Sequence, residues 1–169
     1  PSADIELSYG NYGYIQAKSS VKGGIIKNLL AARISFSGTQ RDGTVYNIAK
    51  NEYVNDINNL GYRAQLLFTP NDKIKINLTG DNSKQNPNGY AQIIAGVVET
   101  QRPAYRQFNN IIADLNYTLP STNAFDRIID HDTPWRSLNE LGGISLNADF
   151  EIGKGTLTST TAWRYWNWG

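Results

Sequence analysis

The connections between strand-like segments are very unevenly distributed along this chain of 169 residues. Segments 60–69 and 73–82 both alternate apolar and polar side chains, and only Pro70, Asn71 and Asp72 separate them. The next strong alternation begins only near residue 142. Soluble β-sandwiches rarely distribute loops in this way. The sequence therefore predicts strands joined by tight turns at one end and by the long loops 42–59 and 82–140 at the other.

Alternation with a period of two residues predicts seven strands. In the first strand, Ile5, Leu7 and Tyr9 share one face, while Asp4 and Glu6 lie on the other. The remaining strands follow the same rule, so each has one apolar and one polar face. The seven predicted strands cover residues 4–11, 14–23, 29–42, 60–69, 73–82, 142–152 and 156–168.

Alternation alone does not distinguish a lipid-facing sheet from a soluble sheet with one wet face. The predicted strands are about as long as the roughly 9 to 11 residues that cross a bilayer with tilt. Their charged side chains avoid the apolar face, where an Arg or Lys in lipid costs roughly 2 to 4 kcal/mol at mid-depth. We interpret these residues as lumen-facing groups that form ion pairs, rather than as a substrate path. They are Arg33, Arg63, Lys75, Asp149, Glu151 and Arg164.

Aromatic residues gather toward both ends of the predicted apolar faces. This distribution resembles the two aromatic girdles of an outer-membrane barrel, although ordinary core aromatics are the alternative. Tyr9, Phe36, Tyr62, Trp163 and Tyr165 lie toward the long loops, and Phe68 and Phe150 toward the tight turns. We therefore expect an all-β fold, an antiparallel up-and-down transmembrane β-barrel. About seven strands would be present here, and the barrel would continue beyond them.

Composition excludes several other classes. The apolar runs are far shorter than the roughly 18 to 20 residues of a membrane helix, so a helical membrane protein is excluded. The net charge of +1, without a cluster of basic and aromatic residues, argues against nucleic acid as a partner. The chain has no cysteine, one histidine and no G-x-S-x-G motif, so we expect neither an enzyme nor a bound cofactor.

Four segments resemble the TonB-dependent outer-membrane receptors, in the region where the barrel begins after the plug domain. Each segment is a degenerate barrel pattern, but their order and the lengths of their connections agree with the family over most of the chain. They are IELSYGNYG (5–13), LLAARISFSGTQRDG (29–43), GYRAQLLFTPND (61–72) and GTLTSTTAWRYW (155–166).

The resemblance implies a bacterial outer-membrane transporter with a barrel of roughly 22 strands around an N-terminal plug. It implies energised import of a scarce small molecule or metal chelate, such as a siderophore–iron complex, a vitamin or a glycan. The plug and the segment that contacts TonB are not in this chain, so its partners here would be the lipid bilayer, the plug and the ligand. Segments 23–28, 70–72 and 153–155 would be periplasmic turns, and 42–59 and 82–140 extracellular loops.

Two features of the second long loop are candidate sites. Tyr90, Arg102 and Tyr105 accompany an apolar stretch (93–98) and could line a ligand mouth, although a loop that packs its own apolar residues is the favoured reading. The triplet Asp130-His131-Asp132 suggests a metal site, but a lone loop triplet seldom supplies converging ligands. We therefore expect no metal.

The sequence is also compatible with two alternatives. A smaller porin-like or adhesin-like barrel would share the faces, girdles and loops but would have no plug and need no energy. A soluble all-β carbohydrate-binding module would use exposed aromatic residues to stack on sugar rings. Its candidates are Trp163, Trp166 and Trp168.

Overall fold

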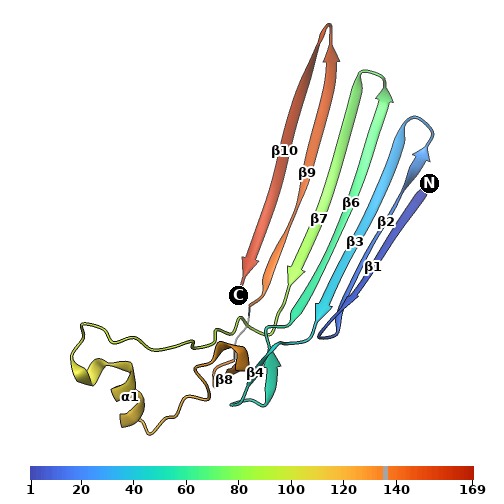
Figure 1. The fold of residues 1–169 in the computed structure, drawn as a ribbon. Coiled ribbons are helices and arrows are strands. Elements are labelled where there is room, and N and C mark those ends of the chain that lie inside the picture. The colour runs from blue at the N-terminus through green and yellow to red at the C-terminus, as the bar shows by residue number, and fades with distance from the viewer. Residues whose placement is uncertain (135–136) are drawn as a thin grey trace.

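A computed structural model describes residues 1–134 and 137–169. The fold is dominated by one seven-stranded antiparallel sheet with the strand order β1-β2-β3-β6-β7-β9-β10 (Figure 1). The prediction of an all-β chain with seven antiparallel strands is confirmed. The strands are β1 (Ser2–Gly10), β2 (Tyr14–Ile26), β3 (Leu30–Arg41), β6 (Ile57–Asn71), β7 (Ile74–Gln85), β9 (Asn139–Ile152) and β10 (Gly155–Trp168).

Tight turns join β2 to β3, β6 to β7 and β9 to β10 at the same end of the sheet (Figure 1). The β1–β2 turn lies at the opposite end, beside the long loops. In this turn Tyr12 and Gly13 have φ values of 59° and 64°, and the Tyr14 amide donates to the Asn11 carbonyl at 3.3 Å. Two consecutive positive φ values are the signature of a type I′ turn, whose twist matches that of the flanking strands.

Several strands are longer than the alternation predicts. The Gly23–Gly24 pair does not end β2, which continues to Ile26 through an irregularity in its pairing with β3. Strand β6 runs through Pro70 to Asn71, and its register with β7 shifts between Phe68 and Asn71. A proline has no amide hydrogen to donate, and a break in the ladder accommodates it.

The two long loops contain a second, three-stranded sheet with the order β5-β4-β8. Its strands are β4 (Val45–Asn47), β5 (Glu52–Val54) and β8 (Ile128–Ile129). Loop 82–140 also holds the short helices η1 (Ala104–Arg106), α1 (Phe108–Asp114) and η2 (Ala124–Asp126). No helix among the described residues is long and apolar enough to cross a bilayer. We call the three-stranded sheet and its connections (residues 42–56 and 86–134) the loop cap.

The buried apolar residues of the chain lie mostly in the loop cap. Val45, Val54 and Ile129 form the buried cluster, and Ala91 and Ile93 pack against it. Ile93 thus joins a core shared by both long loops, whereas Ile94, Val97 and Val98 of the apolar stretch 93–98 are exposed. In the large sheet Ala148 is the one buried apolar residue among those described.

The strand register places nearly all large apolar side chains of the seven-stranded sheet on one face. Ile34 pairs with Val21 and Ala64, and Leu146 pairs with Leu78. Nothing in the described chain covers this face, and Ile5 keeps 77% of its surface exposed. The aromatic residues expected to form girdles all lie on it: Tyr9, Phe36, Tyr62, Phe68, Phe150, Trp163 and Tyr165.

Candidate functional site

The opposite face of the sheet is polar and collects the charged side chains. Lys75 is the cross-strand partner of Asp149, Arg63 pairs with Asp81, and Glu151 pairs with Thr156. By the same register, every residue that the sequence assigns to a lumen side lies on this polar face. They are Arg33, Arg63, Lys75, Asp149, Glu151 and Arg164.

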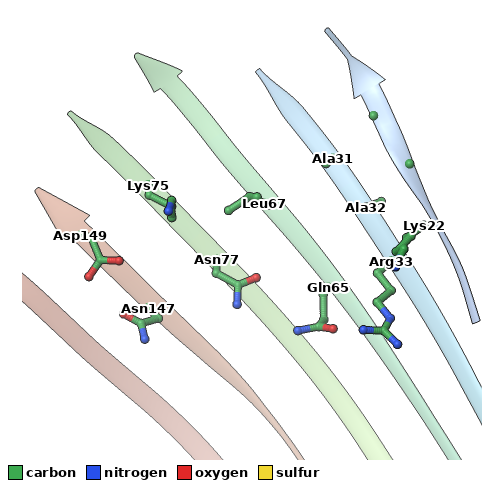
Figure 2. Close-up of a pocket in the computed structure, with 12 residues that line it drawn as sticks. Lys22, Ala31, Ala32, Arg33, Gln65, Leu67, Lys75, Asn77, Asn147 and Asp149 are labelled. Carbon is green, nitrogen blue, oxygen red and sulfur yellow. The ribbon is translucent and has the colours of Figure 1, made fainter. Parts of the chain in front are cut away.

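A hollow of about 580 Å³ lies on the polar face toward the tight turns (Figure 2). Lys22, Arg33 and Lys75 line it, together with amides and a single carboxylate, Asp149. The sequence-predicted residues Arg33, Lys75 and Asp149 are therefore brought to one hollow. The cations outnumber the carboxylate there, so this part of the face would attract negative charge.

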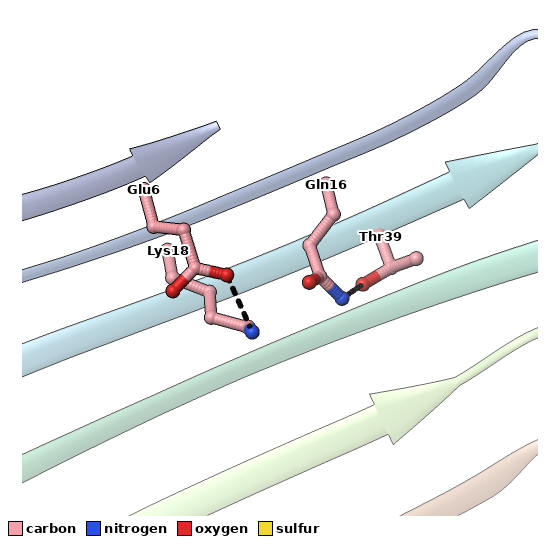
Figure 3. A network of polar contacts seen from close by, with 4 residues as sticks. All are labelled: Glu6, Gln16, Lys18 and Thr39. Atoms are coloured by element: carbon pink, nitrogen blue, oxygen red, sulfur yellow. Dashed lines mark hydrogen bonds and ion pairs between the residues drawn. The ribbon is translucent and has the colours of Figure 1, made fainter. Parts of the chain in front are cut away.

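Polar contacts link neighbouring strands across this face at the β1 edge. Lys18 donates to Glu6 at 3.0 Å, and the Gln16 amide donates to the Thr39 hydroxyl at 2.9 Å (Figure 3). The half of the sheet nearest β1 is thus held by polar side chains as well as by its backbone ladder.

Ser20 is a buried hydroxyl that lies between a carboxylate and a guanidinium. It donates to Asp4 Oδ2 at 3.2 Å and accepts from Arg33 Nη2 at 3.5 Å. Arg33 is therefore tied by this hydroxyl to the β1 edge.

Arg164 spans a strand to reach its partner. Its Nη1 lies 2.7 Å from Asp81 Oδ1, which joins β10 to β7 across β9. Gly143 of β9 pairs with both residues, and the absence of a side chain there leaves room for the guanidinium arm. Arg63 lies in the same part of the face, since it is the cross-strand partner of Asp81.

A second side chain crosses β9 at the preceding residue, on the opposite face. Tyr165 lies over Gly142, where an added Cβ would approach its ring to 2.7 Å. Its hydroxyl accepts from the Asn82 amide at 2.5 Å and donates to Glu140 at 3.2 Å. The Gly142-Gly143 pair therefore leaves room for side chains of β10 to bond with β7 on both faces of the sheet. The packing of an aromatic ring over a strand glycine is a known stabilising arrangement in β-sheets.

Two buried or half-buried asparagines hold the loop cap together. Asn47 is only 3% exposed; its amide donates to the His131 carbonyl at 2.8 Å and its oxygen accepts from the His131 amide at 3.0 Å. Asn55 makes the same two-way contact with the backbone of Ala91. Each side-chain amide donates to and accepts from one backbone residue, as a residue of a neighbouring strand would, and so joins loop 42–59 to loop 82–140.

The Asp130-His131-Asp132 triplet is used in these loop contacts. Among the described residues, no three His, Cys, Asp or Glu side chains gather as metal ligands would. The His131 ring contacts the Thr133 carbonyl at 3.1 Å. Burial, with a hydrogen bond to Asp130, raises the pKa of the Tyr117 hydroxyl.

The three loop residues expected at a ligand mouth are all exposed, and no contact among them brings them together. Tyr105 stacks with Arg106, its neighbour in η1, at 5.6 Å. Arg102 is bonded through its backbone to Thr100 and Gln107. Tyr90 lies in the stretch between β7 and the helices. None of these three side chains lines the hollow on the polar face.

The three tryptophans of β10 are divided between the two faces. Trp163 pairs with Ile144 on the apolar face, whereas Trp166 pairs with Leu141 and Trp168 with Asn139 on the polar face. The Trp166 and Trp168 rings are nearly parallel, with an interplanar angle of 7° and centroids 6.1 Å apart. Because successive side chains of a strand point to opposite faces, the segment TAWRYWNW (161–168) already predicts that Trp163 lies on one face and that Trp166 and Trp168 lie on the other.

Neither a protein-family model nor a solved structure matches this chain. Its function is therefore inferred from its own residues and their geometry.

Proposed function

We propose that this chain is part of the barrel wall of a TonB-dependent outer-membrane receptor, which imports a scarce small molecule or metal chelate with energy from TonB. In this arrangement the apolar face of the sheet contacts lipid and the polar face lines the lumen. The tight turns lie in the periplasm and the loop cap outside the cell. The plug and TonB would be its protein partners.

The uncovered apolar face is the observation that carries the proposal. Burying an aliphatic or aromatic side chain stabilises a protein by roughly 1.5 to 3 kcal/mol, so leaving this face in water would forfeit tens of kcal/mol. Contact of this face with the hydrocarbon of a bilayer would remove that loss. The exposed residues on this face include Ile5, Leu7, Ile34, Tyr62, Leu66, Ile144, Leu146, Ile152, Leu157 and Trp163.

The height of the apolar band also suits a bilayer. The band extends along β9 from Gly142, which lies under Tyr165, to Ile152, which pairs with Gly155. At about 3.3 Å per residue this distance is about 33 Å. A strand tilt of about 40° would reduce it to about 25 Å, the usual height of the apolar band in outer-membrane barrels.

The polar residues of the apolar face support the same orientation. Lys84 and Glu140 are cross-strand partners on this face, and both lie at the loop-cap end. Asn82 and the hydroxyl of Tyr165 lie one step inward. Polar groups at this level would meet lipid headgroups rather than hydrocarbon.

The open edges of the sheet favour a larger barrel. Strands β1 and β10 each have one neighbour within the described chain. Their free amide and carbonyl groups would be unsatisfied in lipid unless further strands paired with them. A 22-stranded receptor barrel would supply those strands.

Fractionation of cells that make the full-length protein tests the proposal. Inner and outer membranes are separated on a density gradient, and uptake of candidate ligands is compared with and without functional TonB. We expect the protein to sediment with lipopolysaccharide and uptake to require TonB. Recovery in the soluble fraction would reject a membrane role, and TonB-independent diffusion would favour a plugless porin.

A further inference from the structure

Trp166 and Trp168 expose a large aromatic surface on the polar face of the sheet. Contact with lipid does not explain this exposure, because the proposed lipid contact is on the apolar face. Their side chains are 63% and 77% exposed. Trp163, on the opposite face, has the position expected of a girdle residue. Two neighbouring exposed indoles on a polar face suggest that a ligand covers them.

The polar groups around the two indoles are held in fixed positions. The Trp166 indole nitrogen donates to Asn139 Oδ1, and Asn139 Nδ2 donates to Gln85 Oε1 at 3.2 Å. Asn139 is the cross-strand partner of Trp168, and Gln85 is the partner of Asn139 on the next strand, so the three side chains form one row on the polar face. A binding group that is already oriented loses less conformational entropy when a ligand arrives.

The same cluster has hydrogen-bonding capacity to spare. Within the described residues, neither the Trp168 indole nitrogen nor Gln85 Nε2 donates to another group, and Asn139 Nδ2 has a second hydrogen. These donors would suit hydroxyl oxygens, while the amide oxygens could accept from hydroxyl hydrogens.

Among the described residues, the charge closest to the two indoles on the polar face is paired: Arg164, two residues before Trp166 on the same face, contacts Asp81. Arg63, the other cation beside Asp81, lies on β6, three strands away from β10. An anionic chelate would require an uncompensated cation close to the rings. A neutral ligand with apolar C–H faces and many hydroxyl groups fits this combination of indoles, amides and balanced charge better.

We propose that Trp166 and Trp168, with Asn139 and Gln85 beside them, form a binding subsite for a sugar ring of a neutral oligosaccharide. One part of this inference rests on the proposed receptor function, namely that the subsite would face the lumen near the extracellular mouth. It would then be an early contact for an imported glycan.

Calorimetric titration of the full-length protein with three probes tests this subsite. The probes are cellohexaose, maltohexaose and xylohexaose. The detergent should be lauryldimethylamine oxide, since sugar-based detergents would compete for the indoles. We expect saturable binding of at least one probe, and we expect Trp166→Ala or Trp168→Ala to weaken it by about tenfold or more.

The controls separate stacking from a general effect on β10. Trp163→Ala removes an indole from the same strand but from the opposite face, so it should change the affinity by less than about twofold. Gln85→Ala lies on β7 and removes a donor without altering β10; it should weaken binding by about threefold or more. Its result applies even if the tryptophan variants fail to fold.

Three results would overturn the inference. They are no saturable binding of any probe, an equal loss in Trp163→Ala, or Trp166-dependent binding of an iron(III) tris-catecholate in place of the sugars. Membrane fractionation keeps this test separate from the proposed function. A membrane-inserted protein without sugar binding would refute the subsite alone, whereas a soluble protein that binds sugar through these residues would refute the receptor function alone.

Discussion

The Arg164 guanidinium lies 2.7 Å from the Asp81 carboxylate and reaches it by passing over Gly143 of the strand between them. Tyr165 passes over Gly142 on the other face and bonds with Asn82. The two glycines thus allow three strands to be linked by side chains as well as by backbone hydrogen bonds, close to where the sheet meets the loop cap.

Gly143→Ala should destabilise the sheet. An added Cβ would lie 2.2 Å from the Trp163 carbonyl oxygen and 2.8 Å from Arg164 Cδ. Relief of that overlap requires backbone movement, which typically costs about 1 to 3 kcal/mol. The free energy of unfolding in detergent, measured by urea titration, checks this expectation. Gly80→Ala is the matched control on β7, because its Cβ would meet nothing closer than 4.0 Å. Equal effects from the two substitutions would contradict the crossing arrangement.

Asn47→Ala should loosen the loop cap without affecting the large sheet. The substitution removes both hydrogen bonds between Asn47 and the backbone of the half-buried His131, at a cost of about 1 to 3 kcal/mol. Hydrogen exchange should become faster in β4 and β8 and remain unchanged in β9. Asn86→Ala, which alters an exposed asparagine at the start of loop 82–140, should leave both rates unchanged. Unaltered exchange in β8 of the Asn47 variant would show that the contact does not hold the loops together.

Tyr117 should ionise above the usual tyrosine pKa of about 10. Burial and the Asp130 carboxylate both raise the pKa of its hydroxyl by opposing the tyrosinate form. The stability that this contact contributes is therefore fully present below the pKa of an unfolded tyrosine, and it is lost as pH rises through the higher folded-state pKa. The difference in tyrosinate absorbance between the parent protein and Tyr117→Phe isolates this group.

Asp130→Asn should lower the midpoint of that difference titration, whereas Asp126→Asn should leave it in place. Asp126 bonds with Ser121 and Asn123 instead. A midpoint that responds equally to both substitutions would contradict the assigned contact.

Leu146→Arg should block assembly into the outer membrane. Leu146 pairs with Leu78 and Thr161 near the middle of the apolar band, where an Arg in lipid costs about 2 to 4 kcal/mol. The neighbouring substitution Asn147→Arg places the same charge on the polar face and should be tolerated. Heat-modifiable migration of the protein in outer-membrane fractions reports assembly. Tolerance of both substitutions would argue against lipid at Leu146.

The large sheet could be predicted from the sequence because its information is local. In 144–152 every second residue is apolar, and a slip of one position would move all of them to the other face. The end of β2 was harder to predict, since a Gly-Gly pair is a typical turn signal. Here the strand continues through it, with irregular pairing before Ile26.

The loop cap could not be predicted in the same way. Strands β4 and β8 pair in parallel although more than eighty residues separate Asn47 from Ile129. Segments of two or three residues carry no periodic signal, and a contact such as Asn47 with His131 depends entirely on tertiary structure. For the same reason, composition grouped Tyr90, Arg102 and Tyr105 in one loop, but it could not establish whether their side chains meet.

The most direct test of the central claim is a nitroxide scan along β9. This chain has no cysteine, so single cysteines at successive positions from 144 to 150 would be its only thiols. They can be introduced into the full-length protein, with any cysteine outside this chain replaced by serine, and spin-labelled in lipid vesicles. Power saturation then compares collisions with oxygen, which concentrates in lipid, and with a water-soluble nickel complex. We predict that oxygen accessibility peaks at Ile144, Leu146, Ala148 and Phe150 and that nickel accessibility is low at these four positions. High nickel accessibility at these four positions would show that the apolar face does not contact lipid.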